Sequence, residues 1–189
     1  MGSITLARHG EPALSRKVRL TSAEYRDWWA SYEVGGLKEA QTPPSGLVAT
    51  ARDAGVILAS TRRRAIETAQ ALGRDRAFTP DDALVEAPLP PPALPGWVKL
   101  SPRQWGVVAR IWWWFFDRHE EETRTQAQAR ADAVAATLIE RADAGDDVLV
   151  LAHGFFNNMV GRALRRRGWR CTDDGGYRYW SARRFEKRG

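Results

Sequence analysis

Two histidines follow apolar runs in this sequence, and each stands directly before a glycine. The first run leads into the tripeptide Arg8–Gly10, and a later one leads into His153 and Gly154. An arginine cluster at 62–64 follows a third apolar run. A neutral imidazole nitrogen can attack phosphorus in line and carry it covalently, whereas guanidinium groups bind phosphate oxygens through paired, charge-assisted hydrogen bonds. These residue types together indicate chemistry on a phosphoryl group.

The remaining roles in such a reaction also have candidates. A second imidazole can hydrogen-bond the transferring oxygens, and a carboxylic acid such as Glu86 can protonate the departing oxygen and then act as a base for water. Gly10 and Gly154 would let the backbone approach the anion closely. The chain has three histidines, and His119 lies in the charged stretch DRHEEE, so no metal-ligand spacing results. We therefore expect neither a metal nor a cofactor.

Four apolar runs are predicted to form the strands that position these groups, at residues 3–7, 55–60, 83–86 and 147–152. The last is almost continuous Val and Leu, which is typical of a strand covered on both faces. Helical spacing of apolar side chains predicts helices over residues 62–72, 121–142 and 155–167. Alternating strands and helices favour an α/β sandwich with a mostly parallel sheet. Ligands bind beyond the carboxyl ends of such strands, so the candidate residues should meet there.

Three motifs resemble the histidine phosphatase superfamily, which includes cofactor-dependent phosphoglycerate mutases and many acid and sugar phosphatases. They are LARHG at 6–10, STRRRAIETA at 60–69 and VLVLAHG at 148–154, in the family's order. The resemblance implies a three-layer α/β/α sandwich with the phosphoglycerate mutase-like arrangement. It also implies that residues 1–189 form a single domain of this family.

The resemblance implies a role for each residue that matches the motifs. His9 would be the nucleophile, Arg8 and Arg64 would hold the phosphoryl group, and His153 would complete the pocket. Arg64 is chosen over its neighbours because it precedes the alanine of the second motif. Glu86 would be the proton donor, because the family often carries a Glu soon after the third strand.

The substrate pocket is expected to differ from that of many relatives. They often have Thr after the first motif and Asn six residues beyond the nucleophile, whereas this chain has Pro12 after Glu11 and has Ser15. One interpretation is that Ser15, Arg16 and Lys17 bind a second anionic group of the substrate, and another is that they form a solvated basic loop. Arg62 is a further candidate for contact with a substrate anion.

Two segments outside the motifs, residues 11–45 and 88–120, are expected to form a cap over the strand ends. Residues 87–103 are rich in proline and should form an extended surface connection. The apolar run 107–116, which contains Trp112–Phe116 (WWWFF), is too short to cross a bilayer. We favour a buried helix that covers the sheet or the site. A membrane surface contact or a homodimer interface are the alternatives.

Composition limits the partners. The net charge of +6 and sequence pI of about 10.0 favour an anionic partner. A phosphorylated small molecule fits best, because the sequence lacks the modules typical of nucleic-acid binding. The single cysteine, Cys171, and the absence of a leader or a long apolar run predict a cytoplasmic protein.

The leading functional hypothesis is a metal-independent phosphatase that hydrolyses a phosphomonoester through a phosphohistidine on His9. A phosphomutase of the same superfamily is an alternative, because the two activities share these residues and differ in how well water is excluded. Another alternative is a membrane-apposed protein that binds phosphate or lipid phosphate with little catalysis.

Overall fold

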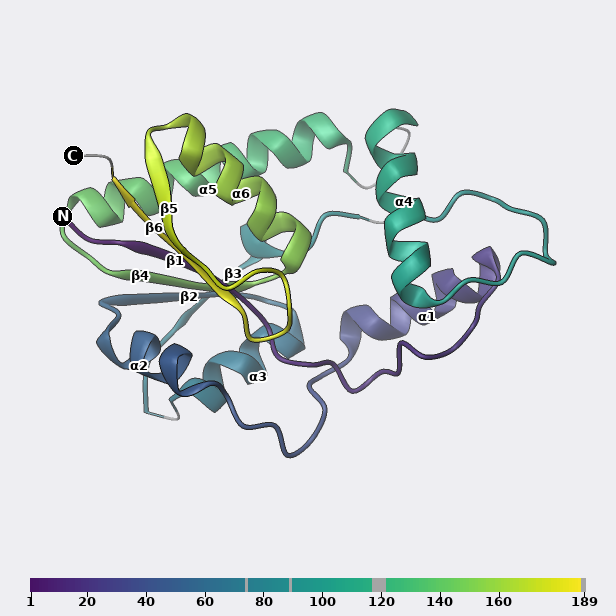
Figure 1. Ribbon diagram of the computed structural model, residues 1–189, viewed down its shortest axis with the longest axis horizontal. Helices are drawn as coiled ribbons and strands as arrows, with labels where there is room; N and C mark the ends of the chain where they lie inside the picture. Colours follow the sequence, from purple (N-terminus) through teal and green to yellow (C-terminus); the bar gives the residue numbers. More distant parts are fainter. Residues whose placement is uncertain (74, 89, 117–121, 188–189) are drawn as a thin grey trace.

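A mostly parallel, six-stranded sheet forms the centre of the structure, a computed structural model that describes residues 1–73, 75–88, 90–116 and 122–187 (Figure 1). The strands lie in the order β3-β2-β4-β1-β6-β5. Their bounds are β1 Ile4–Arg8, β2 Val56–Ser60, β3 Thr79–Asp81, β4 Val148–Ala152, β5 Trp169–Asp174 and β6 Ala182–Lys187. The first four strands in this order are parallel, and the pair β5–β6 joins β1 antiparallel. The predicted α/β class is thereby confirmed.

Helices cover both faces of the sheet, as a strand without polar alternation requires. Helices α5 and α6 lie on one face and α2 and α3 on the other (Figure 1). Val148 and Val150 of β4 enter the core with α5 and α6, whereas Leu149 and Leu151 enter the core with α2 and α3. The bounds of these helices are α2 Ser45–Asp53, α3 Arg63–Leu72, α5 Arg124–Asp143 and α6 Gly154–Arg166. The sandwich therefore has three layers.

Two further helices, α1 Ser22–Val34 and α4 Pro102–Phe116, lie beyond the carboxyl ends of the parallel strands (Figure 1). They pack through a separate aromatic core of Tyr25, Trp28, Tyr32 and Trp105, in which the Tyr25 and Trp105 rings stack 5.7 Å apart. The predicted cap is thus confirmed for the described parts of residues 11–45 and 88–120; residues 89 and 117–120 lie outside them.

The third strand was wrongly predicted. Residues 83–86 are not a strand; β3 comes earlier, and a short 3-10 helix, η1 Asp82–Leu84, follows it. The Asp81 carboxylate accepts the Ala83 amide at 2.8 Å, which starts the turn. Residues 83–85 are apolar because Leu84 is buried in the core beside α5, and not because they form a strand.

The other expected elements are confirmed with shifted ends. Helices α3 and α6 match the predicted spans within a residue. Helix α5 begins at Arg124 because Thr123 and Gln126 form a capping box; residue 121 lies outside the described residues. The strands β5 and β6 had no counterpart among the predicted elements.

The aromatic run on α4 is divided between two environments. Trp113 is buried, whereas Trp112, Phe115 and Phe116 are 42%, 74% and 51% exposed. The favoured interpretation, a buried helix, therefore holds for only one face of α4. The other face is apolar and exposed.

Candidate active site

The carboxyl ends of three adjacent strands carry the centre of the site. His9 follows β1, Ser60 ends β2 and His153 follows β4. The two imidazole rings lie 5.1 Å apart, edge to face. They border a small cavity of about 20 Å³, together with Arg8, Arg64 and Glu86. The structure thus brings together the five residues predicted to be catalytic.

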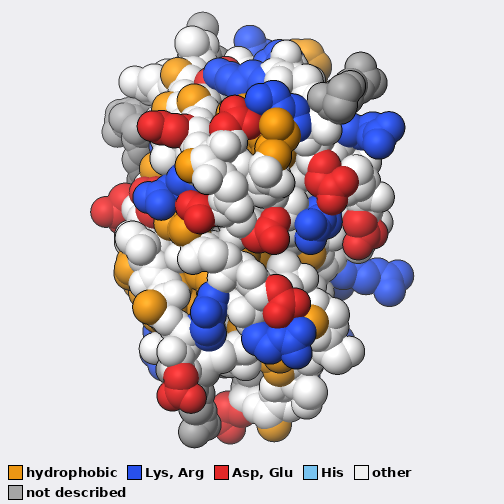
Figure 2. All heavy atoms as spheres, turned by 90° about the vertical axis from the view of Figure 1, so that its left-hand side faces the viewer, with side chains coloured by type: hydrophobic (Ala, Val, Ile, Leu, Met, Phe, Trp, Pro, Cys, Tyr) orange, Lys and Arg blue, Asp and Glu red, His pale blue; other side chains and the backbone are white. Residues whose placement is uncertain are grey.

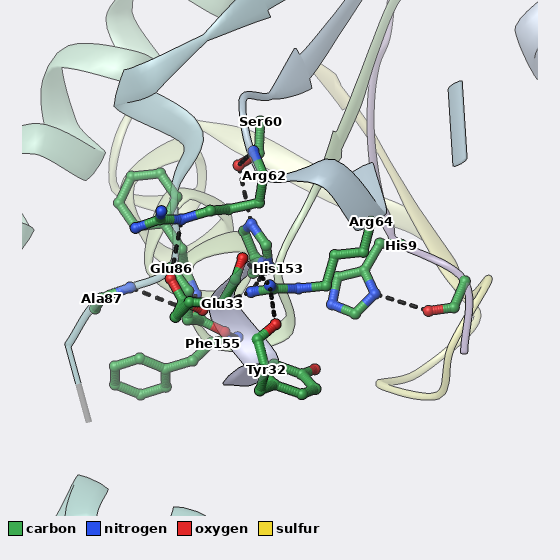
Figure 3. Close-up of polar contacts among 12 residues, drawn as sticks. His9, Tyr32, Glu33, Ser60, Arg62, Arg64, Glu86, Ala87, His153 and Phe155 are labelled. Atoms are coloured by element: carbon green, nitrogen blue, oxygen red, sulfur yellow. Dashed lines mark hydrogen bonds and ion pairs between the residues drawn. The ribbon is translucent and has the colours of Figure 1, made fainter. Parts of the chain in front are cut away.

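The hydrogen bond of His9 sets its tautomer. Its Nδ1 lies 2.7 Å from the Gly10 carbonyl oxygen (Figure 3). A carbonyl can only accept, so Nδ1 carries the proton and the lone pair is on Nε2. Burial lowers the pKa of the His9 imidazole well below its ordinary value of 6.5, and the charges of Arg64 and Arg8 lower it further. These effects favour the neutral form of His9, in which the Nε2 lone pair is available.

His153 uses both ring nitrogens within the protein. The Arg64 Nη2 donates to its Nδ1 at 3.2 Å, so the proton is on Nε2, which donates to the Ser60 Oγ at 2.9 Å. Burial, followed by the charge of Arg64, lowers the pKa of His153 well below its ordinary value. His153 thus orients Arg64 in this state of the site.

Arg64 is fully buried and its charge is compensated by the end of α1. Its Nη1 donates to the carbonyl oxygens of Tyr32 at 2.9 Å and Glu33 at 3.2 Å. Its Nη2 donates to the Glu33 carboxylate at 2.8 Å. A helix C-terminus carries partial negative charge, which favours a cation there. The Arg64 Nε is buried without an acceptor among the described residues.

Glu33 therefore lies where arginines of the second motif meet. One carboxylate oxygen pairs with Arg64, and the other lies 2.9 Å from the Nε of Arg62 (Figure 3). A phosphoryl group bound by these guanidiniums must share them with this carboxylate or displace it. Nothing in the sequence singled out Glu33, which lies outside the three motifs.

Glu86 is held at the start of α6. Its carboxylate accepts the amides of Phe156 at 2.8 Å and Phe155 at 3.3 Å, where the helix N-terminus favours an anion. Glu86 borders the small cavity at His9 and a larger one of about 640 Å³, which Trp29 and Trp112 also line. The Glu86 carboxylate therefore lies where the cavity at His9 and the larger cavity approach each other.

The loop between β5 and β6 also reaches the site. The Arg8 Nη1 donates to the Tyr177 carbonyl at 2.7 Å, and the Arg8 guanidinium lies 4.3 Å from the centre of the Tyr179 ring. The Tyr179 hydroxyl accepts from the Arg16 Nη1 at 2.8 Å. Sequence reasoning missed both tyrosines, since the segment after Gly168 matches no motif.

Only some of the other residues predicted to contact a substrate border a cavity of the site. Arg16 borders the small cavity and Arg62 borders the large one. Ser15 and Lys17 are exposed and border neither; the Ser15 Oγ accepts the Lys17 amide at 3.2 Å. Gly154 packs under Arg8, since a Cβ there would lie 3.3 Å from the Arg8 Nε.

Gly10 has a packing role. Its amide donates to the Thr68 Oγ1 at 3.0 Å, so it is not free for an anion. A Cβ on Gly10 would come within 2.4 Å of the Trp180 ring. The residue must be glycine for the ring to lie against the backbone.

The described residues contain no group of three or more His, Cys, Asp or Glu side chains that could hold a metal ion. His119 lies outside them.

The chain belongs to the histidine phosphatase superfamily. A sequence model of this superfamily, branch 1, matches residues 4–173. The sequence matches no curated protein.

Solved structures with this fold are similar to the chain. A phosphoserine phosphatase from Entamoeba histolytica, in complex with 3-phosphoglyceric acid, has a TM-score of 0.59 at 14% identity, over 88% of this chain and 81% of that chain. A mycobacterial glucosyl-3-phosphoglycerate phosphatase has a TM-score of 0.56 at 22% identity, over 87% and 80%. A putative alpha-ribazole-5'-P phosphatase from Escherichia coli has a TM-score of 0.51 at 17% identity, over 88% and 79%. At these identities the likeness concerns the fold.

We predict that Glu33→Gln weakens the folded state in anion-free buffer and strengthens its response to phosphate. The substitution leaves the buried Arg64 without its countercharge, which should lower the free energy of unfolding by about 2 kcal/mol. Orthophosphate should then raise the melting temperature more than in the unmodified protein, because bound ligand stabilises the folded state. Thermal unfolding with increasing phosphate measures both effects.

The matched control is Glu39→Gln, at an exposed glutamate on the loop after α1. It should leave both quantities unchanged. Equal stabilisation by phosphate in all three proteins would contradict the competition between Glu33 and phosphate.

We predict that the imidazoles of His9 and His153 stay neutral well below pH 6.5, because burial and guanidinium charges lower the pKa of both. The unfolded chain binds protons at these imidazoles near pH 6.5, whereas the folded chain does not. The two neutral imidazoles therefore make their full contribution to the free energy of unfolding above pH 6.5, and this contribution is lost as the pH falls below 6.5. Long-range ¹H–¹⁵N spectra between pH 7 and 5 report the charge of each ring, with the urea-unfolded protein as control. Two imidazolium spectra at pH 6 would refute this prediction.

Proposed function

We propose that this protein is a phosphatase that hydrolyses a phosphomonoester through a phosphohistidine intermediate on His9. The observation that carries the proposal is a neutral imidazole whose Nδ1 is fixed by the Gly10 carbonyl, beside the guanidiniums of Arg8 and Arg64. Membership of the superfamily and the similarity to phosphatase structures support it.

In the first step, the His9 Nε2 attacks phosphorus as the ester P–O bond breaks. The start of α6 favours the Glu86 anion, whereas the negative charge of a bound phosphoryl group favours its protonated form, and it is this form that gives its proton to the departing oxygen. In the second step, Glu86 takes a proton from water, the water oxygen bonds to phosphorus, and the P–N bond to His9 breaks. Arg8 and Arg64 stabilise the charge on the transferring oxygens in both steps.

Guanidinium groups supply the positive charge that this reaction needs, so the proposed mechanism uses neither a metal nor a cofactor. The cavity of about 640 Å³ beside Glu86 leaves room for water next to a small substrate. This favours hydrolysis over the mutase reaction, which requires that water be excluded.

We predict that His9→Asn lowers kcat for 4-nitrophenyl phosphate by at least about 10³-fold, because the covalent route is lost. A chelator should leave the activity of the unmodified protein unchanged. Rapid quenching with ³²P-labelled substrate should trap a protein-bound phosphoryl group that is stable in base and labile in acid, and that is missing in the variant.

Released phosphate, measured against phosphate returned to the substrate, separates hydrolysis from the mutase reaction. Circular dichroism checks that His9→Asn is folded. Activity that survives this substitution within ten-fold, or that needs added metal, would falsify the proposal.

The exposed face of α4 favours a second candidate function, contact with an anionic membrane surface. Val107, Ile111 and Phe115 follow one another at four-residue spacing, and they are 54%, 54% and 74% exposed. The exposed Arg103 lies on the same helix, and a cation beside an apolar stripe suits an anionic lipid surface. None of the described helices has the length and apolar character needed to cross a bilayer.

We predict that the protein co-sediments with phosphatidylglycerol vesicles more than with phosphatidylcholine vesicles. Phe115→Ser should lower the bound fraction several-fold, because it removes apolar area from the contact. The matched control is Trp97→Ser, at a tryptophan 83% exposed outside α4. No binding to either vesicle, or a dimer in solution that Phe115→Ser dissociates, would assign this face a different role.

A further inference from the structure

A second cavity next to the site is lined by arginines. It has a volume of about 290 Å³. Its lining, which we call the arginine pocket, consists of Arg8, Arg16, Arg103, Arg110, Gly154, Phe155, Asn158 and Tyr177. Four of these residues are cationic and none is acidic. Like charges gathered without a countercharge repel one another, so this arrangement is costly unless an anion binds.

The four arginines come from three separate parts of the fold. Arg8 ends β1, and Arg16 lies in the segment before α1. Arg103 and Arg110 lie on α4, seven residues or about two turns apart, and therefore on the same side of the helix. The pocket is thus assembled by the tertiary structure rather than by a local run of basic residues.

Three of the four guanidiniums have an unused donor. The Nε atoms of Arg8, Arg16 and Arg110 are buried without a hydrogen-bond acceptor among the described residues. The Arg110 guanidinium lies 5.2 Å from the centre of the Phe155 ring. The ring face attracts the cation, but it does not accept a hydrogen bond from the Nε as an oxyanion would. A buried donor without an acceptor costs free energy that a bound oxyanion would recover.

Several arginines elsewhere in the described structure pair with carboxylates. Arg130 forms a paired contact with Glu122 at 2.7 Å, and Arg167 pairs with Asp132 at 2.5 Å. Figure 2 shows the end of the molecule opposite the cap, where acidic and basic side chains are interspersed. The lining of the arginine pocket gathers four guanidiniums and contains no such carboxylate.

The arginine pocket is continuous with the site at His9. Arg8, Arg16 and Arg110 border both this pocket and the small cavity that contains the nucleophile. A phosphoryl group at His9 would therefore place an adjacent substituent of the substrate among the arginines. The larger cavity beside Glu86 remains on the other side for the rest of the molecule.

We propose that the arginine pocket binds a second phosphate group of the substrate, so that the preferred substrate is a bisphosphate with a short spacer. This inference rests on the proposed function for the phosphoryl group at His9. Several guanidiniums on one cavity suit phosphate, which accepts paired hydrogen bonds from more than one of them. Among the predicted residues Ser15, Arg16 and Lys17, only Arg16 belongs to the pocket.

Binding is tested by calorimetry on the unmodified protein with two probes that cannot be hydrolysed, propylphosphonate and propane-1,3-bisphosphonate. We expect the bisphosphonate to bind at least about 30-fold more tightly, since charge-assisted hydrogen bonds contribute more than neutral ones. Arg103→Gln, at an exposed residue whose loss should not unfold the chain, should lower the bisphosphonate affinity about ten-fold. Arg110→Gln should do the same.

The matched control is Arg162→Gln, at an exposed arginine of α6 outside the pocket, which should leave both affinities unchanged. Equal affinity for the two probes would overturn the inference. Equal affinity for 3-phosphonopropanoate and the bisphosphonate would overturn the assignment to phosphate, because the former carries a carboxylate in the second position.

Turnover distinguishes failure of this inference from failure of the proposed function. We expect kcat/KM to be higher for propane-1,3-diol bisphosphate than for propyl phosphate, and Arg103→Gln to reduce that ratio about ten-fold. Hydrolysis of both substrates with an unchanged ratio would overturn the arginine pocket and leave the phosphatase standing. Tight bisphosphonate binding without hydrolysis of either substrate would overturn the phosphatase alone.

Discussion

The burial of Arg64 is the constraint on which the rest of the site depends. A guanidinium cannot lose its charge at any working pH, so a fully buried one needs hydrogen-bond acceptors around it. The structure supplies two carbonyls and a carboxylate from the last turn of α1, and the unprotonated nitrogen of His153. One side chain of the second motif thereby joins the last turn of α1 to the site and sets the tautomer of His153.

The same charge also acts on His9. Burial lowers the pKa of the His9 imidazole, and the charges of Arg64 and Arg8 lower it further. Positive charge that suits an anion therefore also favours the neutral imidazole beside it. The tyrosines of the loop before β6 complete the arrangement, because Tyr177 and Tyr179 contact Arg8 and Arg16.

The sequence predicts the parts of this structure that depend on local pattern. Continuous apolar runs identify β1, β2 and β4, and the motif residues at their ends converge because neighbouring parallel strands end at one edge of the sheet. Strand β3 was missed because Thr79–Asp81 holds no apolar residue and pairs only at the edge. Glu33, Tyr179, Arg103 and Arg110 were missed for a different reason. Their importance comes from contacts across long stretches of chain, which no spacing in the sequence encodes.

Because of the Glu33 carboxylate, anion binding at Arg64 and anion binding in the arginine pocket depend differently on the salt in the solvent. At Arg64 a phosphate must compete with the Glu33 carboxylate, whose local concentration is set by the fold and is the same in every buffer. No acidic side chain lines the arginine pocket, so only free anions of the medium compete with a ligand there. Salt also screens the attraction between the arginines and that ligand. Ionic conditions should therefore act mainly on an anion in the arginine pocket and little on an anion at Arg64. For the phosphatase proposed above, selectivity among phosphate esters is thus a property that the surroundings can tune while the site at His9 stays the same.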